Sequence, residues 1–237
     1  MRWSLFLLPA ALSIMGCGHG TGDRVKGTGE VVTREIPVAM LNAIVVDGST
    51  DVTVVRGDTQ RVEVTAQPEL IDLLKTKVDN GVWEITTNKE YSTDREFSVH
   101  LTVPMLNSVI IEGSGNVSSE QVFNTGKTHL AVNGSGSIAI DTLHEGLLEV
   151  AVKGSGSVSV NGTCRELEFT SNGSGDLHAL GLAANEAEIG LKGSGSAELT
   201  VISELEAELS GSGSLRYRGK PEVSTKVTGS GSVTALP

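Results

Sequence analysis

The sequence predicts an all-β protein that folds as a β-solenoid, in which similar turns of chain, here called rungs, stack along one axis. Apolar and polar residues alternate on both sides of a recurring triplet, as is typical of strands with one buried face. A unit this short cannot bury its own apolar face, so neighbouring units must stack. The triplet is Gly-Ser-Gly, recurs every 18–21 residues, and starts at Gly113, Gly134, Gly154, Gly173, Gly193, Gly211 and Gly229.

Each repeat is expected to contain a strand, a Gly-Ser-Gly corner, a second strand and a short polar connection, such as 141–146 or 161–166. A meander of hairpins would also alternate, but it gives no reason for so constant a triplet. Stacked rungs place identical residues on one another, in columns where positive φ or close backbone approach requires glycine. The predicted structural corners are therefore Gly113, Gly115, Gly134, Gly136, Gly154, Gly156, Gly173, Gly175, Gly193, Gly195, Gly211, Gly213, Gly229 and Gly231.

The N-terminal half carries the same pattern in a degenerate form. The segment 44–54 looks like a rung whose triplet has become Gly-Ser-Thr, and further strands are expected at 61–66, 82–87 and 97–103. One short helix is expected over Pro68–Lys75, where apolar residues follow a proline and an acid. We thus expect one solenoid domain over 30–237, with a degenerate part at 30–105 that covers one end of the stack and regular rungs at 106–237. Because only 3% of the residues are aromatic, the bore of the solenoid is expected to exclude large rings.

The first seventeen residues predict export. Arg2 precedes an apolar run that is too short to span a membrane and reads as a secretory signal. The run ends in Ile14-Met15-Gly16-Cys17, which resembles a bacterial lipobox, although an ordinarily cleaved secreted protein is the alternative. We expect a lipoprotein signal peptide at 1–16, lipidation at Cys17, and a flexible glycine-rich tether at 17–29. Because Gly18 rather than aspartate follows the cysteine, the resemblance implies an outer-membrane lipoprotein of the bacterial cell envelope, held to the membrane by its lipid.

Composition and motifs argue against several classes of function. The formal net charge is −11 and the 18 basic residues are scattered without an aromatic platform, so no nucleic-acid partner is expected. The histidines lack zinc-ligand spacing, and the triplet serines do not lie in a Gly-Xaa-Ser-Xaa-Gly motif. Cys164, expected in a connection between strands, is interpreted as an incidental thiol. We therefore predict no catalytic residue, no metal site and no cofactor.

Glutamates recur at two fixed offsets, five and seven residues before the triplets. If the rungs are in register, these side chains point outward and stack in two neighbouring columns. Like charges about 5 Å apart cost less than about 1 kcal/mol in water, so a solvated acidic face is one interpretation. The other is a stripe that binds divalent cations or a basic surface partner. The two columns are Glu149, Glu168, Glu188 and Glu206, and Glu166, Glu186, Glu204 and Glu222.

Four features together resemble the head GIN domain family of auto-transporter adhesins, over nearly the whole chain after the signal. They are the Arg-Xaa-Ile-Pro opening at Arg34–Pro37, the Val-Asp-Gly-Ser-Thr-Asp-Val segment at Val46–Val52, the Val-Pro-Xaa-Leu step at Val103–Leu106, and the serial Gly-Ser-Gly rungs. The resemblance implies a right-handed β-helix and an adhesive or surface role. It brings no catalytic residues with it.

These observations lead to the hypothesis of a non-enzymatic, lipid-anchored envelope protein that acts as an adhesin or surface-binding module, with a cell-surface or polysaccharide ligand. One alternative is a structural or envelope-maintenance protein without a dedicated ligand. The other is a polysaccharide-active enzyme. Enzymes of this kind usually have aromatic platforms for sugars, which are hard to build with two Trp and two Tyr in the whole chain. No helix is expected to cover the last rung, so the C-terminal edge of the solenoid is covered by the N-terminal half or pairs with another molecule, for example in a homo-oligomer.

Overall fold

The computed structural model describes residues 24–120 and 126–237. The expected signal peptide, Cys17 and the first part of the expected tether lie outside these residues. The last part of that tether belongs to the domain, because β1 (Val25–Lys26) pairs in parallel with β8 (Tyr91–Ser92). Next to it, the side chain of Glu69 accepts a hydrogen bond from the Thr28 hydroxyl at 2.8 Å. Backbone pairing therefore fixes residues that the glycine-rich composition predicted to be flexible.

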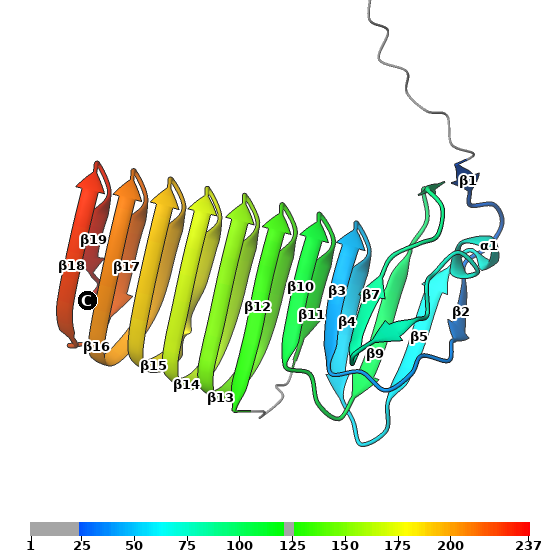
Figure 1. The fold of residues 1–237 in the computed structure, drawn as a ribbon, viewed down its shortest axis with the longest axis horizontal. Helices are drawn as coiled ribbons and strands as arrows, with labels where there is room; N and C mark the ends of the chain where they lie inside the picture. Colours follow the sequence, from blue (N-terminus) through cyan, green and yellow to red (C-terminus); the bar gives the residue numbers. More distant parts are fainter. Residues whose placement is uncertain (1–23, 121–125) are drawn as a thin grey trace, which may run out of the picture.

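The prediction of a β-solenoid is confirmed. The fold is nearly all-β, with 69% strand, 2% helix and about 6 solenoid turns. Figure 1 shows the rungs side by side from β3 to the C-terminus. Each rung is flattened into two faces that meet at the triplet corner. The strands are β3 (Ala43–Gly48), β4 (Asp51–Arg56), β10 (Ser108–Gly113), β11 (Asn116–Ser119), β12 (Lys127–Gly134), β13 (Ser137–Gly154), β14 (Ser157–Gly173), β15 (Asp176–Gly193), β16 (Ser196–Gly211), β17 (Ser214–Arg218), β18 (Glu222–Gly229) and β19 (Ser232–Ala235).

The triplets stack in register, and the first glycines of consecutive rungs are direct partners from Gly48 to Gly229. At the seven triplets these first glycines have φ between 113° and 143°, a range that other residues rarely adopt. The second glycines have no positive φ, but a Cβ on either glycine of a triplet would come within 3.0 Å of the preceding rung. The corner residues named above therefore occupy two columns in which no side chain fits.

The polar connections expected within the rungs are not loops. Residues 141–146 and 161–166 lie inside β13 and β14, which run continuously from one corner to the next. The chain turns there through shifts of register, between Ile140 and Leu143 in β13 and between Ser159 and Gly162 in β14. These residues belong to strands because they keep pairing with the next rung. Their polar composition, which is typical of loops, did not reveal this pairing.

Small aliphatic side chains fill most of the bore, but the expectation that no large ring fits is wrong at Phe169, and Trp83 is also fully buried in the layer that pairs with β3. Phe169 is 1% exposed and stacks between Val150 and Ile189 of the neighbouring rungs. The next inward position of its own strand is Ser171, where the neighbouring rungs have larger aliphatic residues. The small serine leaves room for the ring, and its hydroxyl donates to the Gly175 carbonyl oxygen at 3.0 Å.

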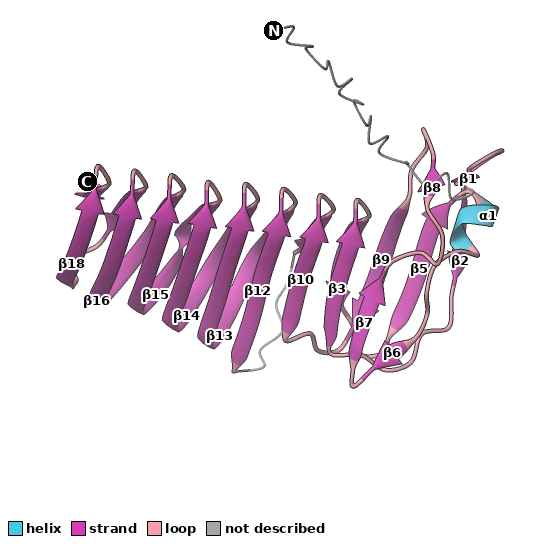
Figure 2. Cartoon of the chain, turned by 45° about the horizontal axis from the view of Figure 1, so that its top comes forward, coloured by secondary structure: helices cyan, strands magenta, loops and turns pink. Residues whose placement is uncertain are grey.

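The N-terminal part covers one end of the stack. Figure 2 shows its strands at that end, next to helix α1 (Pro68–Ile71). Strand β9 (Ser98–Val103) pairs in parallel with β4 and antiparallel with β5 (Arg61–Ala66), whose other edge carries β2 (Val32–Glu35). On the other face β7 (Val82–Ile85) pairs with β3 and with the short β6 (Val78–Asp79). Helix α1 spans Pro68–Ile71 rather than the predicted Pro68–Lys75, because Leu74 already bridges to Thr87.

Candidate functional site

The two glutamate columns lie side by side on the face formed by β12, β18 and the second halves of β13 to β16. The register pairs Glu149 with Glu168, Glu168 with Glu188, and Glu188 with Glu206. The second column runs through Glu166, Glu186, Glu204 and Glu222 in the same way. We call this surface the acidic face. Like charges are therefore direct neighbours across several rungs.

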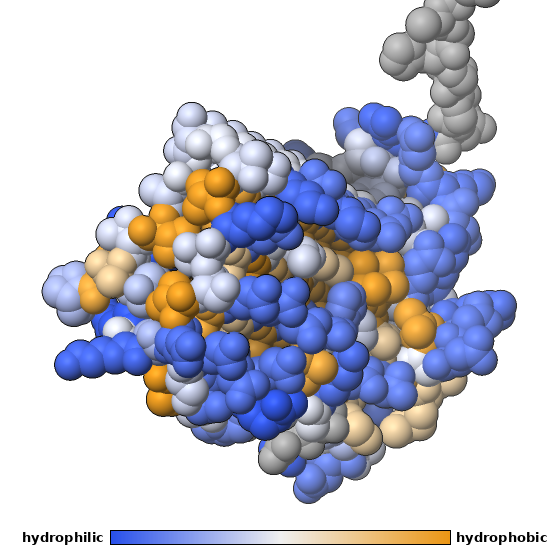
Figure 3. Space-filling model, turned by 60° about the vertical axis from the view of Figure 1, so that its left-hand side comes forward, coloured by the Kyte–Doolittle hydropathy of each residue, from blue (hydrophilic) through white to orange (hydrophobic). Residues whose placement is uncertain are grey.

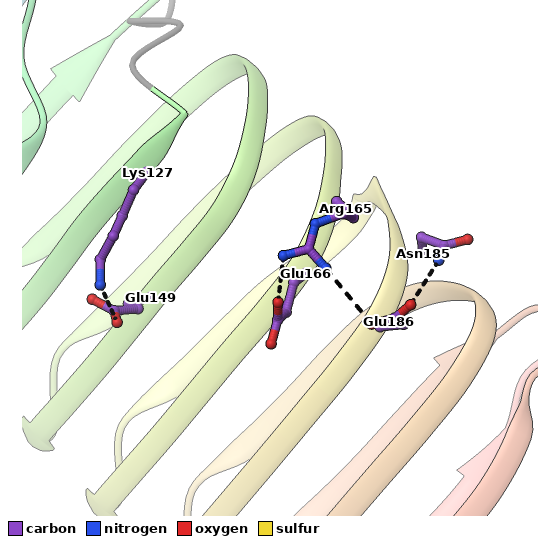
Figure 4. A network of polar contacts seen from close by, with 6 residues as sticks. All are labelled: Lys127, Glu149, Arg165, Glu166, Asn185 and Glu186. Atoms are coloured by element: carbon purple, nitrogen blue, oxygen red, sulfur yellow. Dashed lines mark hydrogen bonds and ion pairs between the residues drawn. The ribbon is translucent and has the colours of Figure 1, made fainter.

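Cations at the edge of the acidic face compensate part of its charge, as Figure 4 shows. Glu149 accepts a hydrogen bond from Lys127 Nζ at 2.7 Å, and His129 Nδ1 lies 3.4 Å from its other oxygen. The hydrogen bond from Lys127 lowers the pKa of Glu149 below its ordinary value and raises that of Lys127. The acidic column thus begins at an ion pair rather than at an isolated carboxylate.

A second contact set lies two rungs further along. Arg165 Nη2 is 2.7 Å from Glu166 Oε2, and its Nη1 is 3.9 Å from Glu186. Asn185 donates to Glu186 at 3.2 Å. Across residues 24–120 and 126–237, the structure contains no group of three or more His, Cys, Asp and Glu side chains placed to hold a metal ion. The columns spread their carboxylates along the stack instead of converging them.

A cleft opens where the corner columns end, at the N-terminal side of the solenoid. A Cβ added to Gly48 would meet nothing within 4 Å, in contrast to the first glycine of every later triplet. Thr50 stands where those triplets have their second glycine, and no corner lies beneath it to exclude its side chain. Beyond this first corner the chain between β7 and β9 leaves the stack and carries β8. We call the space between this segment and the first corner the first-corner cleft.

The first-corner cleft has a volume of about 1090 Å³ and is lined by Arg24 and by residues of 47–53 and 86–98. Tyr91 lies in it, with its ring packed edge-on against Phe97 at 5.0 Å between centroids. Phe97 is buried, so it fixes the position of the tyrosine ring. The wall is otherwise rich in hydroxyl groups, from Ser49, Thr50, Thr53, Thr86, Thr87, Ser92, Thr93 and Ser98.

Most charged side chains of the first-corner cleft are held by neighbours. Arg24 Nη2 donates to Glu90 at 3.1 Å, and the carboxylate of Asp47 accepts from the Thr86 hydroxyl at 3.1 Å. Asp51 accepts from Asn116 and Glu96 from Ser98, at 2.8 and 2.7 Å.

Lys89 and Arg95 differ, because within the described part of the chain neither side chain forms an ion pair. The cleft therefore offers two available cations, one ordered aromatic ring and many hydroxyl groups.

Sequence reasoning did not find this cleft. Segment 86–98 lies outside the repeat. It is held beside the first corner by the hydrogen bond from Thr86 to Asp47 and by the pairing of β8 with β1. One signal was present, since Thr50 replaces a glycine that every later triplet keeps. That substitution marks the place where the column of corners stops.

Comparison with known proteins identifies the family. A family model described as "Putative auto-transporter adhesin, head GIN domain" matches residues 41–221. The chain belongs to the head GIN domain family. This description associates the chain with adhesin-type proteins of the cell envelope or surface. No match was found among curated proteins.

Solved structures share this head GIN fold. A "putative adhesin" from Bacteroides fragilis is similar with a TM-score of 0.84 at 22% identity, over 90% of this chain and 100% of that one. A "putative adhesin" from Parabacteroides distasonis has a TM-score of 0.76 at 27% identity, with the same coverage. A "putative lipid binding protein" from Parabacteroides distasonis has a TM-score of 0.77 at 25% identity, again over 90% and 100%. Each of these crystallised chains is matched over its full length.

Proposed function

We propose that this head GIN protein is a non-enzymatic adhesin of the bacterial cell envelope, and that it binds a cell-surface polysaccharide in the first-corner cleft. The observation that carries the proposal is the cleft itself, where hydroxyl groups surround the fixed ring of Tyr91. Polyhydroxylated ligands are recognised by directed hydrogen bonds and by packing of their apolar faces on aromatic rings. Lys89 and Arg95 favour a polysaccharide that carries carboxylate groups.

The bonding of the carboxylates in the cleft supports a binding role rather than catalysis. Glycoside hydrolysis needs a pair of carboxyl groups free to exchange protons and to attack the sugar. Here Asp47, Asp51 and Glu96 each accept a hydrogen bond from a neighbouring side chain, and Glu90 is paired with Arg24. The lining contains no histidine or cysteine.

A lipid ligand inside the solenoid is disfavoured by the packing of the bore. The space left between Val54, Leu106 and Leu143 has a volume of about 10 Å³. That volume suits about one water molecule and cannot admit an acyl chain. We therefore do not extend the lipid-binding description of the relative from Parabacteroides distasonis to this chain.

We further propose that Cys17 carries a lipid that anchors the protein in the outer membrane. The lipobox-like run before Cys17 supports this. In residues 24–120 and 126–237, no helix is long and apolar enough to span a membrane. Labelling of the full chain with a fatty acid in bacterial cells should mark the native protein and not Cys17→Ser. Gly18→Asp should move the labelled protein from the outer to the inner membrane fraction.

Binding can be tested with residues 24–237, which contain the whole packed core and correspond in length to the crystallised relatives. We expect saturable binding to acidic polysaccharides on a glycan array and to whole cells that display them. The Lys89→Ala/Arg95→Ala double variant should lose most of this binding. The matched control is Lys153→Ala/Lys192→Ala, which removes the same charge from exposed sites on the acidic face and should bind normally.

Each alternative has its own result. Equal loss in both double variants would mean non-specific attraction to a charged polymer and would contradict a site in the cleft. If the native domain binds none of the glycans and cells tested, the envelope-maintenance role is favoured. Shortening of the bound polysaccharide during incubation would favour the enzyme.

A further inference from the structure

The last rung of the solenoid is open on one side. Strand β18 pairs with β16 and β19 pairs with β17, and no described strand pairs with their other edges. Two inward side chains, Val223 and Val227, are 39% and 43% exposed there, whereas Leu205 and Leu209 one rung back are 0% and 1% exposed. Figure 3 views the molecule from this side and shows apolar surface between polar side chains. A long open edge with apolar side chains invites pairing with another strand.

At its other end the molecule covers the stack with an antiparallel strand. Strand β5 adds to β9 in antiparallel register, with Val62 opposite Leu101 and Val64 opposite Val99. Val62 and Val64 are 2% and 0% exposed, so the added strand extends the core by one layer. A parallel stack of this geometry therefore accepts an antiparallel strand beyond its last parallel layer.

We propose that a second copy of this chain covers the last rung, with β18 pairing antiparallel to the partner's β18 about a twofold axis at Thr225. The sequence of β18 is self-complementary in this register. Val223 lies opposite the partner's Val227 and Val227 opposite the partner's Val223, so both exposed valines become buried. A twofold contact uses the same edge on both copies, and it closes at the dimer instead of growing into a fibre.

The charges at this edge fit a second copy as well. On the outward side, Glu222 lies diagonal to the partner's Lys226, within reach of a long side chain. The first glutamate column ends before this rung, because Ser224 occupies the position that follows Glu206. Lys226 also contacts Glu208 of its own chain at 2.6 Å, which holds it on the outward face. The last rung thus avoids the like charges that would keep two acidic molecules apart.

The dimer has a consequence for binding. Because the first-corner cleft lies at the far end of the solenoid, pairing of the two last rungs places the two clefts at opposite ends of an elongated particle. Two sites on one particle raise the apparent affinity for a repetitive surface without any new contact. The pairing itself does not depend on what the cleft binds.

The oligomeric state of residues 24–237 tests the proposal. Sedimentation velocity should show a dimer that dissociates on dilution, and Val223→Lys/Val227→Lys should be monomeric with an unchanged far-UV circular dichroism spectrum. Both valines are part-exposed in one copy, so this variant is expected to fold. Thr170→Lys/Asn172→Lys, which adds the same charge to exposed positions of an inner rung, should remain dimeric. A native domain that is monomeric at all concentrations, or that forms open-ended polymers, would overturn the proposal.

Cross-linking tests the register. Thr225→Cys lies opposite its own copy and should form a disulfide-linked dimer under mild oxidation. In Thr228→Cys the two cysteines would be about 20 Å apart, so it should not cross-link. The native Cys164 does not interfere, because it is buried and its thiol stays protonated. Cross-linking at position 228 instead of 225 would overturn the twofold register at Thr225.

Discussion

The backbone N–H of Ser155 donates to the carbonyl oxygen of Gly134, one rung earlier, at 2.9 Å. The same bond recurs at every triplet, from Ser114 to Gly48 through Ser230 to Gly211, at 2.8–2.9 Å. The corner is therefore a hydrogen-bonded column, and the serine contributes its backbone rather than its hydroxyl. Each glycine carbonyl accepts at a point where a Cβ on the next rung would collide with it.

Two glycines with almost the same φ separate backbone strain from collision. Gly154 has φ 118° and Gly48 has φ 115°, but only at Gly154 would a Cβ meet the preceding rung. We expect Gly48→Ala to lower the free energy of unfolding by about 1–3 kcal/mol through strain alone. Gly154→Ala should lower the free energy of unfolding by about 1–3 kcal/mol more than Gly48→Ala does, because the stack must open to admit the methyl group.

Chemical denaturation of the two variants measures this difference. Ser155→Ala is the control, and it should be neutral because its backbone bond remains. Equal losses at Gly48 and Gly154 would show that close approach does not matter in the column.

The bore predicts a coupled pair at Phe169 and Ser171. Phe169→Ile alone leaves a void, and Ser171→Val alone overpacks the bore and removes the hydrogen bond to Gly175. The double variant gives this rung the aliphatic pair that its neighbours use. It should cost less than the sum of the single variants, by about 0.5–3 kcal/mol. Additive losses in a double-mutant cycle would mean that the two residues do not share one space.

These two cases show what the sequence could and could not predict. The period of the triplet fixes which residues face inward and which are neighbours, so the glutamate columns follow from counting. The small Ser171 leaves room for the large Phe169, and this compensation can be predicted only once both residues are known to lie in one layer of the bore. The first-corner cleft depends on contacts between β1 and β8, more than sixty residues apart in the sequence, and no periodicity reports them.

The acidic face predicts a stabilising substitution. Glu168 lies between Glu149 and Glu188 in its column, and Lys127, whose charge also acts on Glu168, is bonded to Glu149 instead. Glu168→Gln should therefore raise the melting temperature at low salt. The corresponding gain in the free energy of unfolding should not exceed about 1 kcal/mol. The gain should vanish in about 1 M salt, where the Debye length is about 3 Å.

Glu208→Gln serves as the comparison. It should lower the melting temperature at low salt, because Glu208 is paired with Lys226. The same melting curves with and without calcium also test the cation interpretation of the acidic face. A calcium-dependent rise in the native melting temperature that Glu168→Gln abolishes would show that the columns bind the ion.

Burial of Cys164 predicts a defined pH dependence. Desolvation raises the pKa of its thiol from an ordinary value of 9.0 to about 12. The thiol should therefore resist alkylation in the folded protein at pH 8 and react in urea. Between pH 9 and 12 the unfolded chain loses this proton while the folded chain keeps it, so the thiol lowers stability by up to about 1.4 kcal/mol per pH unit. Cys164→Ala lacks this contribution and matches Ala184, its partner on the next rung. Its unfolding free energy should thus fall less steeply than that of the native domain over this window, and parallel slopes would contradict the burial of the thiol.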